Sequence, residues 1–131
     1  MPVVALYAAL LSLLFIGLSA RTIGLRRRLQ IGIGDAGSAE MLRAMRVYSN
    51  FAEYVPLALL LIYFAEVSGA PHALVHALGL SLLLGRLVHA YGVSQVNENF
   101  RFRVVGMVVT FSTLGICAGY LLLRFGSALV G

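Results

Sequence analysis

Four long apolar segments, separated by short polar or glycine-containing connections, dominate the sequence. The first runs from Val3 to Ala20 and the last from Val104 to Leu123, and neither contains a charged residue. A helix needs about 20 apolar residues to cross roughly 30 Å of hydrocarbon. Charged residues make up 11% of the chain, whereas a soluble domain has about 25%. These features predict an integral membrane protein.

The connections set the boundaries of the predicted helices. The stretch Gly32–Ser38 contains three glycines and is too polar to span. Either Ser38 or Asp35 is expected to cap the helix that follows. SGAP is a tight turn, and the polar segment QVNENFRFR precedes the last apolar run. We expect an all-α bundle of four transmembrane helices in one domain over residues 1–131, with helices over about 3–29, 40–67, 71–94 and 101–125.

All ten basic residues are arginines, and most of them flank two of the three connections. Arginine-rich connections stay on the cytoplasmic side of a membrane, and with four spans the first and third connections share one side. We therefore predict both termini on the non-cytoplasmic side of a cell membrane, the inner membrane in a bacterium. The lipid bilayer is the expected partner of this charge pattern, and nucleic acid is not.

One face of the second predicted helix carries polar side chains at spacings of three, four and three residues, which places them in one row. This polar stripe consists of Arg43, Arg46, Asn50 and Glu53, with Tyr54 at its border. An unpaired charge in hydrocarbon costs about 2.5–3.5 kcal/mol even on permissive scales. The polar stripe is therefore expected to face protein or a water-filled cavity.

Further ionisable residues are expected at the same depth in the third and fourth helices. These are Arg86, His89, Arg101 and Arg103. In one interpretation Glu53 neutralises a single arginine in a structural pair, and the other arginines extend toward the interface. The surplus of arginines over carboxylates favours a second interpretation, in which the cluster binds an anion supplied by a ligand.

The pattern R-x-x-x-N-x-x-E-Y-x-P, from Arg46 to Pro56, resembles the second-helix signature of the MAPEG family, the membrane-associated proteins in eicosanoid and glutathione metabolism. The length, the four spans, and the arginines within the third helix and at the start of the fourth add to this resemblance. It covers essentially the whole chain and points to a bacterial-type member. It implies a homotrimer with glutathione, as co-substrate, bound between adjacent subunits on the cytoplasmic side.

The resemblance also implies roles for individual residues. Arg103 is the expected catalytic residue that faces the glutathione thiol, with Arg101 as the second candidate. One of Arg26, Arg27 and Arg28 is expected to supply a basic contact from the first helix. The substrate-binding residues expected on this basis are Arg28, Arg43, Arg46, Asn50, Glu53, Tyr54, Arg86, His89 and Arg101.

The chemistry of glutathione agrees with these roles. Its two carboxylates suit arginine forks, and its ammonium suits Glu53. A thiol with a pKa of about 8.5 is mostly protonated at neutral pH, so a nearby arginine would stabilise the nucleophilic thiolate. We expect a glutathione-dependent transferase or peroxidase acting on a lipophilic small molecule, either an electrophile or a hydroperoxide. The alternative is a non-catalytic binding or scaffold module with a basic cleft.

Two positions depart from the family pattern. Eicosanoid-type members have a tyrosine seven residues after the third-helix arginine, and prostaglandin-type members have a serine after the catalytic arginine. This chain has Val93 and Val104 at those positions. These departures weaken any assignment of a named eicosanoid reaction, and they leave glutathione binding better supported than catalysis.

Two remaining motifs are interpreted as structural. His72 and His76 have a spacing that could share a metal, but Glu66 is the only candidate for a third ligand, so no metal site is expected. Gly115-x-x-x-Gly119 is a close-packing motif, interpreted as packing within the subunit or the trimer.

Overall fold

The structure is a computed structural model that describes residues 1–130 and the side chains of residues 1–129. Within that range the regular secondary structure consists of four helices: α1 (Val4–Leu29), α2 (Ala39–Val67), α3 (His72–Ser94) and α4 (Phe100–Val130). All four are long and apolar enough to cross a membrane, which confirms the predicted all-α class. The last helix continues beyond its expected end near 125, because the residues that follow include no proline to stop it.

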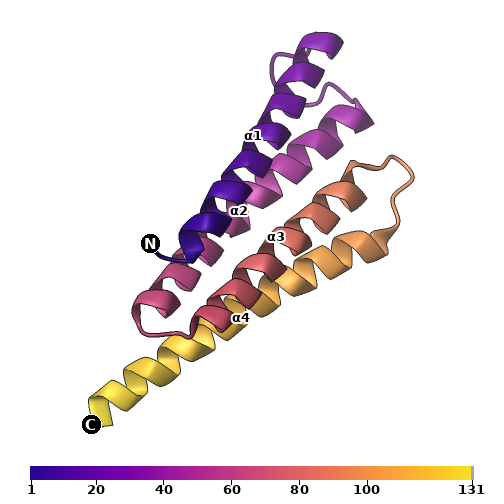
Figure 1. Cartoon of the computed structure of the whole chain (residues 1–131). Coiled ribbons are helices and arrows are strands. Elements are labelled where there is room, and N and C mark those ends of the chain that lie inside the picture. The colour runs from indigo at the N-terminus through magenta and orange to yellow at the C-terminus, as the bar shows by residue number, and fades with distance from the viewer. Residues whose placement is uncertain (131) are drawn as a thin grey trace.

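The helices run alternately up and down, so the connections lie at two ends of the bundle (Figure 1). The 30–38 and 95–99 connections lie at one end, which we call the arginine-rich end. The 68–71 turn lies at the other. Toward the arginine-rich end the α1–α2 pair and the α3–α4 pair diverge, and at the opposite end α4 projects past the turn (Figure 1).

Local contacts explain where the first two helices begin. Of the two predicted caps for α2, Ser38 is the one used, since its Oγ accepts from the Met41 backbone N–H at 3.2 Å. Glu66, near the end of α2, accepts from the backbone N–H groups of Val3 and Val4 at 2.5 and 2.9 Å. Its carboxylate therefore satisfies N–H groups that the start of α1 leaves without partners.

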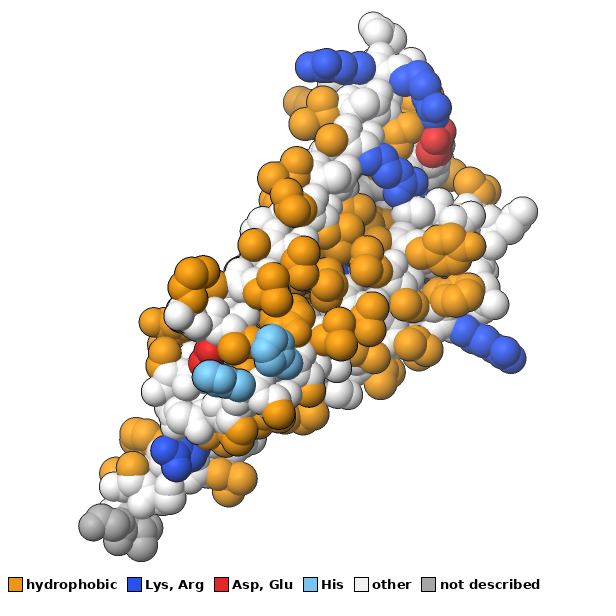
Figure 2. Space-filling model, viewed as in Figure 1, with side chains coloured by type: hydrophobic (Ala, Val, Ile, Leu, Met, Phe, Trp, Pro, Cys, Tyr) orange, Lys and Arg blue, Asp and Glu red, His pale blue; other side chains and the backbone are white. Residues whose placement is uncertain are grey.

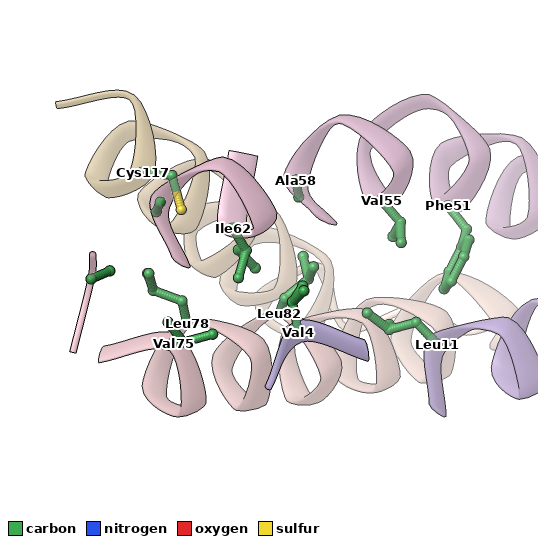
Figure 3. Close-up of a cluster of buried hydrophobic side chains, with 12 residues drawn as sticks. Val4, Leu11, Phe51, Val55, Ala58, Ile62, Val75, Leu78, Leu82 and Cys117 are labelled. Carbon is green, nitrogen blue, oxygen red and sulfur yellow. The ribbon is translucent and has the colours of Figure 1, made fainter. Parts of the chain in front are cut away.

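The hydrophobic core fills the half of the bundle away from the arginine-rich end, and all four helices contribute to it (Figure 3). Leu11, Ile62 and Leu82 are among its fully buried side chains. The labelled residues of this cluster are Val4, Leu11, Phe51, Val55, Ala58, Ile62, Val75, Leu78, Leu82 and Cys117. This core fixes the relative positions of α2, α3 and α4, which carry the candidate site.

Glycines allow α3 and α4 to approach closely next to the polar residues. A Cβ atom added to Gly106 would lie 2.5 Å from the His89 Cβ and 2.7 Å from the Gly85 carbonyl oxygen. Gly106 therefore allows the two helices to pack closely within the chain. At Gly115 and Gly119, by contrast, an added Cβ would meet no atom within 4 Å.

On the face seen in Figure 2, many hydrophobic side chains are exposed between the two ends of the molecule. Leu13, Leu122 and Leu123 are 66%, 72% and 77% exposed. Side chains this apolar and this exposed are typical of a surface that lipid or another membrane protein covers. Arginine side chains gather instead at the arginine-rich end (Figure 2).

Candidate functional site

Arg86 lies at the centre of a buried polar network between α2, α3 and α4. Its side chain is 1% exposed. Nη2 donates to Oδ1 of Asn50 at 2.5 Å and lies 3.0 Å from Nδ1 of His89, while Nη1 donates to Oγ1 of Thr110 at 3.4 Å. Because a guanidinium has only donors, Nδ1 of His89 is the acceptor in its contact. The polar stripe of α2 thus meets the ionisable pair of α3 inside the protein.

No carboxylate among the described residues pairs with Arg86, and its Nε has no hydrogen-bond partner there. The interpretation in which Glu53 neutralises an arginine finds no such contact, since Glu53 is exposed and forms no ion pair within residues 1–129. A buried cation without a counter-ion is unfavourable. The interior below the arginine-rich end therefore keeps a positive charge that could attract an anion.

Glu98, in the connection between α3 and α4, joins two of the predicted site arginines. Its Oε2 accepts from Nη1 of Arg43 at 2.8 Å, and its Oε1 lies 3.7 Å from Nη1 of Arg103. Arg43 also donates to the carbonyl of Val93 at 3.1 Å. Arg43 on α2 and Arg103 on α4 are therefore held around one carboxylate.

These residues border a cavity of about 290 Å³ at the arginine-rich end, which we call the arginine pocket. Arg46 also lines it and has no hydrogen-bond or ion-pair partner among the described side chains. The arginine pocket therefore contains an arginine side chain that no other described side chain engages.

The three candidate arginines of α1 lie in different surroundings. Arg28 pairs with Glu40 at 2.6 Å, and both side chains are largely exposed. Arg27 is exposed. Arg26 donates to the Gly34 carbonyl at 3.0 Å and lines a second cavity, of about 430 Å³, together with Arg46. Of the three, Arg26 is thus the one beside a cavity that a polar-stripe residue also borders.

The remaining predicted site residues do not line the arginine pocket. The ring of Tyr54 packs edge-to-face against Phe111 of α4, with ring centroids 5.4 Å apart. Arg101 is exposed at the start of α4, and Glu53 is exposed on α2. The chain by itself therefore does not bring Arg28, Glu53 or Arg101 into the arginine pocket.

A sequence model of the MAPEG family matches residues 4–123. The chain belongs to the MAPEG family. It is also 40% identical over 110 residues to the inner membrane protein YecN of Escherichia coli K12, an alignment that covers 84% of this chain and 82% of YecN. YecN of Escherichia coli O6:H1 matches with the same identity and coverage. The four apolar helices of this MAPEG chain make it an integral membrane protein in contact with the bilayer.

Sequence reasoning missed Glu98 as part of this MAPEG site. The residue stands in a polar connection, between Asn97 and Asn99, and such segments are usually solvated. Both asparagines are exposed, whereas the Glu98 side chain is 5% exposed. One feature of the sequence could have indicated this role: Glu98 stands just before Arg101 and Arg103, which had been assigned to the site.

One of the two histidines at the opposite end, His76, has a structural contact. The Tyr7 hydroxyl lies 2.9 Å from Nδ1 of His76, and Glu66 is occupied at the start of α1. The described residues contain no group of three His, Cys, Asp or Glu side chains placed to hold a metal.

Proposed function

We propose that this MAPEG protein is a glutathione-dependent transferase or peroxidase that acts on lipophilic electrophiles or hydroperoxides. The observation that carries the proposal is the arginine pocket, in which Arg43, Arg46 and Arg103 surround one cavity in a chain of this family. Glutathione has two carboxylates, which suit guanidinium partners. Arg86 adds a buried positive charge beneath the pocket.

Arg103 is proposed to stabilise the glutathione thiolate. Its side chain is 39% exposed and its contact with Glu98 is a loose one of 3.7 Å, so its donors remain available to a ligand. A donor aimed at the sulfur favours the thiolate over the thiol, and the thiolate is the nucleophile. Lowering the thiol pKa by one unit from about 8.5 would raise the thiolate fraction at pH 7 about eightfold.

The chemical steps follow from that nucleophile. With an aryl or alkyl halide, the sulfur forms a C–S bond and the halide leaves with the bonding electrons. With a hydroperoxide, the sulfur attacks the terminal oxygen, the O–O bond breaks, and the alkoxide leaves with the bonding electrons and takes up a proton to give the alcohol. A second glutathione then reduces the sulfenic product, which gives the disulfide and water.

The proposed assembly is a homotrimer, with the glutathione site completed by the adjacent subunit on the cytoplasmic side. Support comes from the exposed side chains of Glu53 and Arg46, which lie on α2, a helix apolar enough to span the membrane. Leaving such charges to lipid is costly. A second copy that covers this face would shield both side chains and add arginines from its own α1.

The test is a binding measurement followed by an activity assay on the full chain in detergent. Calorimetry with glutathione is expected to show binding, and conjugation to an aromatic halide or reduction of a lipid hydroperoxide is expected to follow. Binding without turnover of either acceptor would favour a non-catalytic module with a basic pocket. Absence of glutathione binding would reject the proposed function.

A further inference from the structure

A groove lies between α4 and the end of α2, at the end of the bundle opposite the arginine-rich end. Its volume is about 470 Å³. The residues that line it are Phe64, Ser68, Leu121, Arg124, Phe125 and Ala128. Among these described residues Arg124 alone carries a charge. The groove therefore combines one cation with walls that are mostly apolar.

The guanidinium of Arg124 is held in place while most of its donors stay available. Its Nε donates to the Ser68 carbonyl at 3.1 Å. A Cβ atom added to Gly69 would lie 3.5 Å from Nη2, so the guanidinium rests against the 68–71 turn. Neither Nη atom has a hydrogen-bond or ion-pair partner within residues 1–129. The group is thus oriented by the protein and open to a ligand.

A purely structural role for Arg124 leaves its charge unexplained. A cation beside the last carbonyls of a helix is favourable, and Arg124 has this position at the end of α2. The carbonyl of Ser68 is neutral, however, and it engages a single donor of the guanidinium. The polar end of the groove therefore keeps a positive charge that can attract an anion.

The order of polar and apolar residues along the groove matches that of a phospholipid. Phe64 lies one turn before Ser68 on α2, and Leu121 lies about one turn before Arg124 on α4. The apolar part of the groove thus points toward the middle of the bundle. Because α2 is long enough to span the membrane and ends at Val67, the polar part lies where the hydrocarbon meets the headgroups.

We propose that this groove binds an anionic phospholipid of the leaflet at this end of the bundle. The free Nη atoms of Arg124 donate to the phosphate, a group that suits a guanidinium fork, and one acyl chain lies against Phe64 and Leu121. Ala128, one turn beyond Arg124, has a small side chain that leaves room for the headgroup. Phosphatidylglycerol is preferred over phosphatidylcholine, because the choline cation competes with Arg124 for the phosphate. This inference is independent of the proposed glutathione binding.

The experiment measures lipid binding to the full chain in an uncharged detergent. Native mass spectrometry gives the affinity of the first bound phosphatidylglycerol and of phosphatidylcholine with the same acyl chains. The wild type is expected to prefer phosphatidylglycerol about tenfold, as for a hydrogen bond between charged groups. In Arg124→Gln the preference is expected to fall to about threefold or less. In Arg101→Gln it is expected to persist, since Arg101 is exposed on the same helix at the arginine-rich end.

Two results of this comparison would overturn the inference. One is a wild type that does not distinguish the two lipids. The other is a preference that survives in Arg124→Gln or falls equally in Arg101→Gln, because binding would then reflect the overall positive charge of the chain. Glycerophosphoglycerol, which is the same headgroup without acyl chains, is expected not to displace the lipid. Displacement by this compound would show that the apolar part of the groove contributes nothing.

A second variant tests the groove without touching the contact between Arg124 and Ser68. Ala128→Phe keeps the cation and fills the space beside it, at an exposed position. It is expected to weaken phosphatidylglycerol binding at least about threefold, with thermal unfolding and the oligomer mass unchanged. Undiminished binding would overturn the inference even if Arg124→Gln does not fold. A lower oligomer mass with unchanged lipid binding would instead mean that a second copy of the chain occupies the groove.

Discussion

Nη2 of Arg86 and Oδ1 of Asn50 are 2.5 Å apart and join α3 to α2 in the interior. Asn50 is a neutral partner for a charged group, so it satisfies one donor without cancelling the charge. Replacing the asparagine changes the surroundings of a cation that has almost no access to water. Protein stability should therefore respond strongly to this one amide.

Asn50→Ala is expected to destabilise the protein by about 2–3 kcal/mol, since it leaves a buried charged donor unpaired. Thermal unfolding in detergent, or unfolding by added denaturing detergent, measures the change. The control is Asn97→Ala, because Asn97 is exposed and its side chain makes no hydrogen bond in the described structure. Similar losses in the two variants would mean that the Arg86–Asn50 contact contributes little.

A double replacement separates stability from function. In Arg86→Met combined with Asn50→Leu, the buried charge and its acceptor are both removed, and such replacements are often neutral or stabilising. The double variant is expected to be at least as stable as Asn50→Ala and to bind glutathione at least about tenfold more weakly than the wild type. Unchanged affinity would show that the buried charge has no part in attracting the ligand.

Two pocket arginines are expected to affect different kinetic constants. Arg103→Ala should lower kcat about a hundredfold, the typical effect of removing a donor from a developing anion, with a smaller change in glutathione affinity. Arg46→Ala should instead weaken affinity about tenfold. Initial-rate kinetics with varied glutathione, together with calorimetry, separate these effects. Equal effects of both replacements on kcat would contradict the assignment of the thiol to Arg103.

Among the arginines of α1, Arg26 is expected to matter for glutathione binding. Arg26→Ala should weaken glutathione binding severalfold to tenfold, because it removes a cation from the cavity that Arg46 also lines. Arg124→Ala is the matched control, since Arg124 also donates to a connecting carbonyl, that of Ser68 at 3.1 Å, but at the opposite end of the bundle. Calorimetry on both variants should show a loss in the first alone.

The close approach of α3 and α4 predicts a strong effect at Gly106. Gly106→Ala should destabilise the protein by about 1–3 kcal/mol through overpacking, because its methyl group would collide with His89 and with the Gly85 carbonyl. Gly126→Ala in the same helix meets no atom within 4 Å, and we expect a change within about 0.5–1 kcal/mol. If Gly106→Ala unfolds at the wild-type temperature, the two helices do not pack as closely as described.

Hydropathy sufficed to predict the four spans because burial in lipid acts on whole segments, and a few misjudged residues do not alter the result. The spacing of the polar stripe likewise indicated that Asn50 and Arg46 share a face. Which side chains contact one another within the site depends on differences of a few ångströms in their positions. Asn50 and Glu53 are one helical turn apart on α2, and periodicity cannot tell which of them reaches Arg86.

The inward turn of Glu98 has a different origin. It depends on Arg43, which is 55 residues away in the chain, and on the short connection that brings α4 back beside α2. The same holds for Glu66, whose contact with the start of α1 links residues more than 60 positions apart. Long-range contacts of single side chains leave no periodic signal in one sequence, so both acids were assigned other roles or none.

The length of α4 bears on how the molecule sits in its membrane. Its 31 residues span about 46 Å, close to the 40–45 Å of a bilayer with its headgroups. Arg101 and Arg124, both exposed, are separated by about 35 Å along this helix, so each guanidinium can reach the phosphates of one leaflet. The two arginines would then fix the position of α4 along the bilayer normal, and a thinner bilayer of lipids with shorter acyl chains would increase the tilt of this helix.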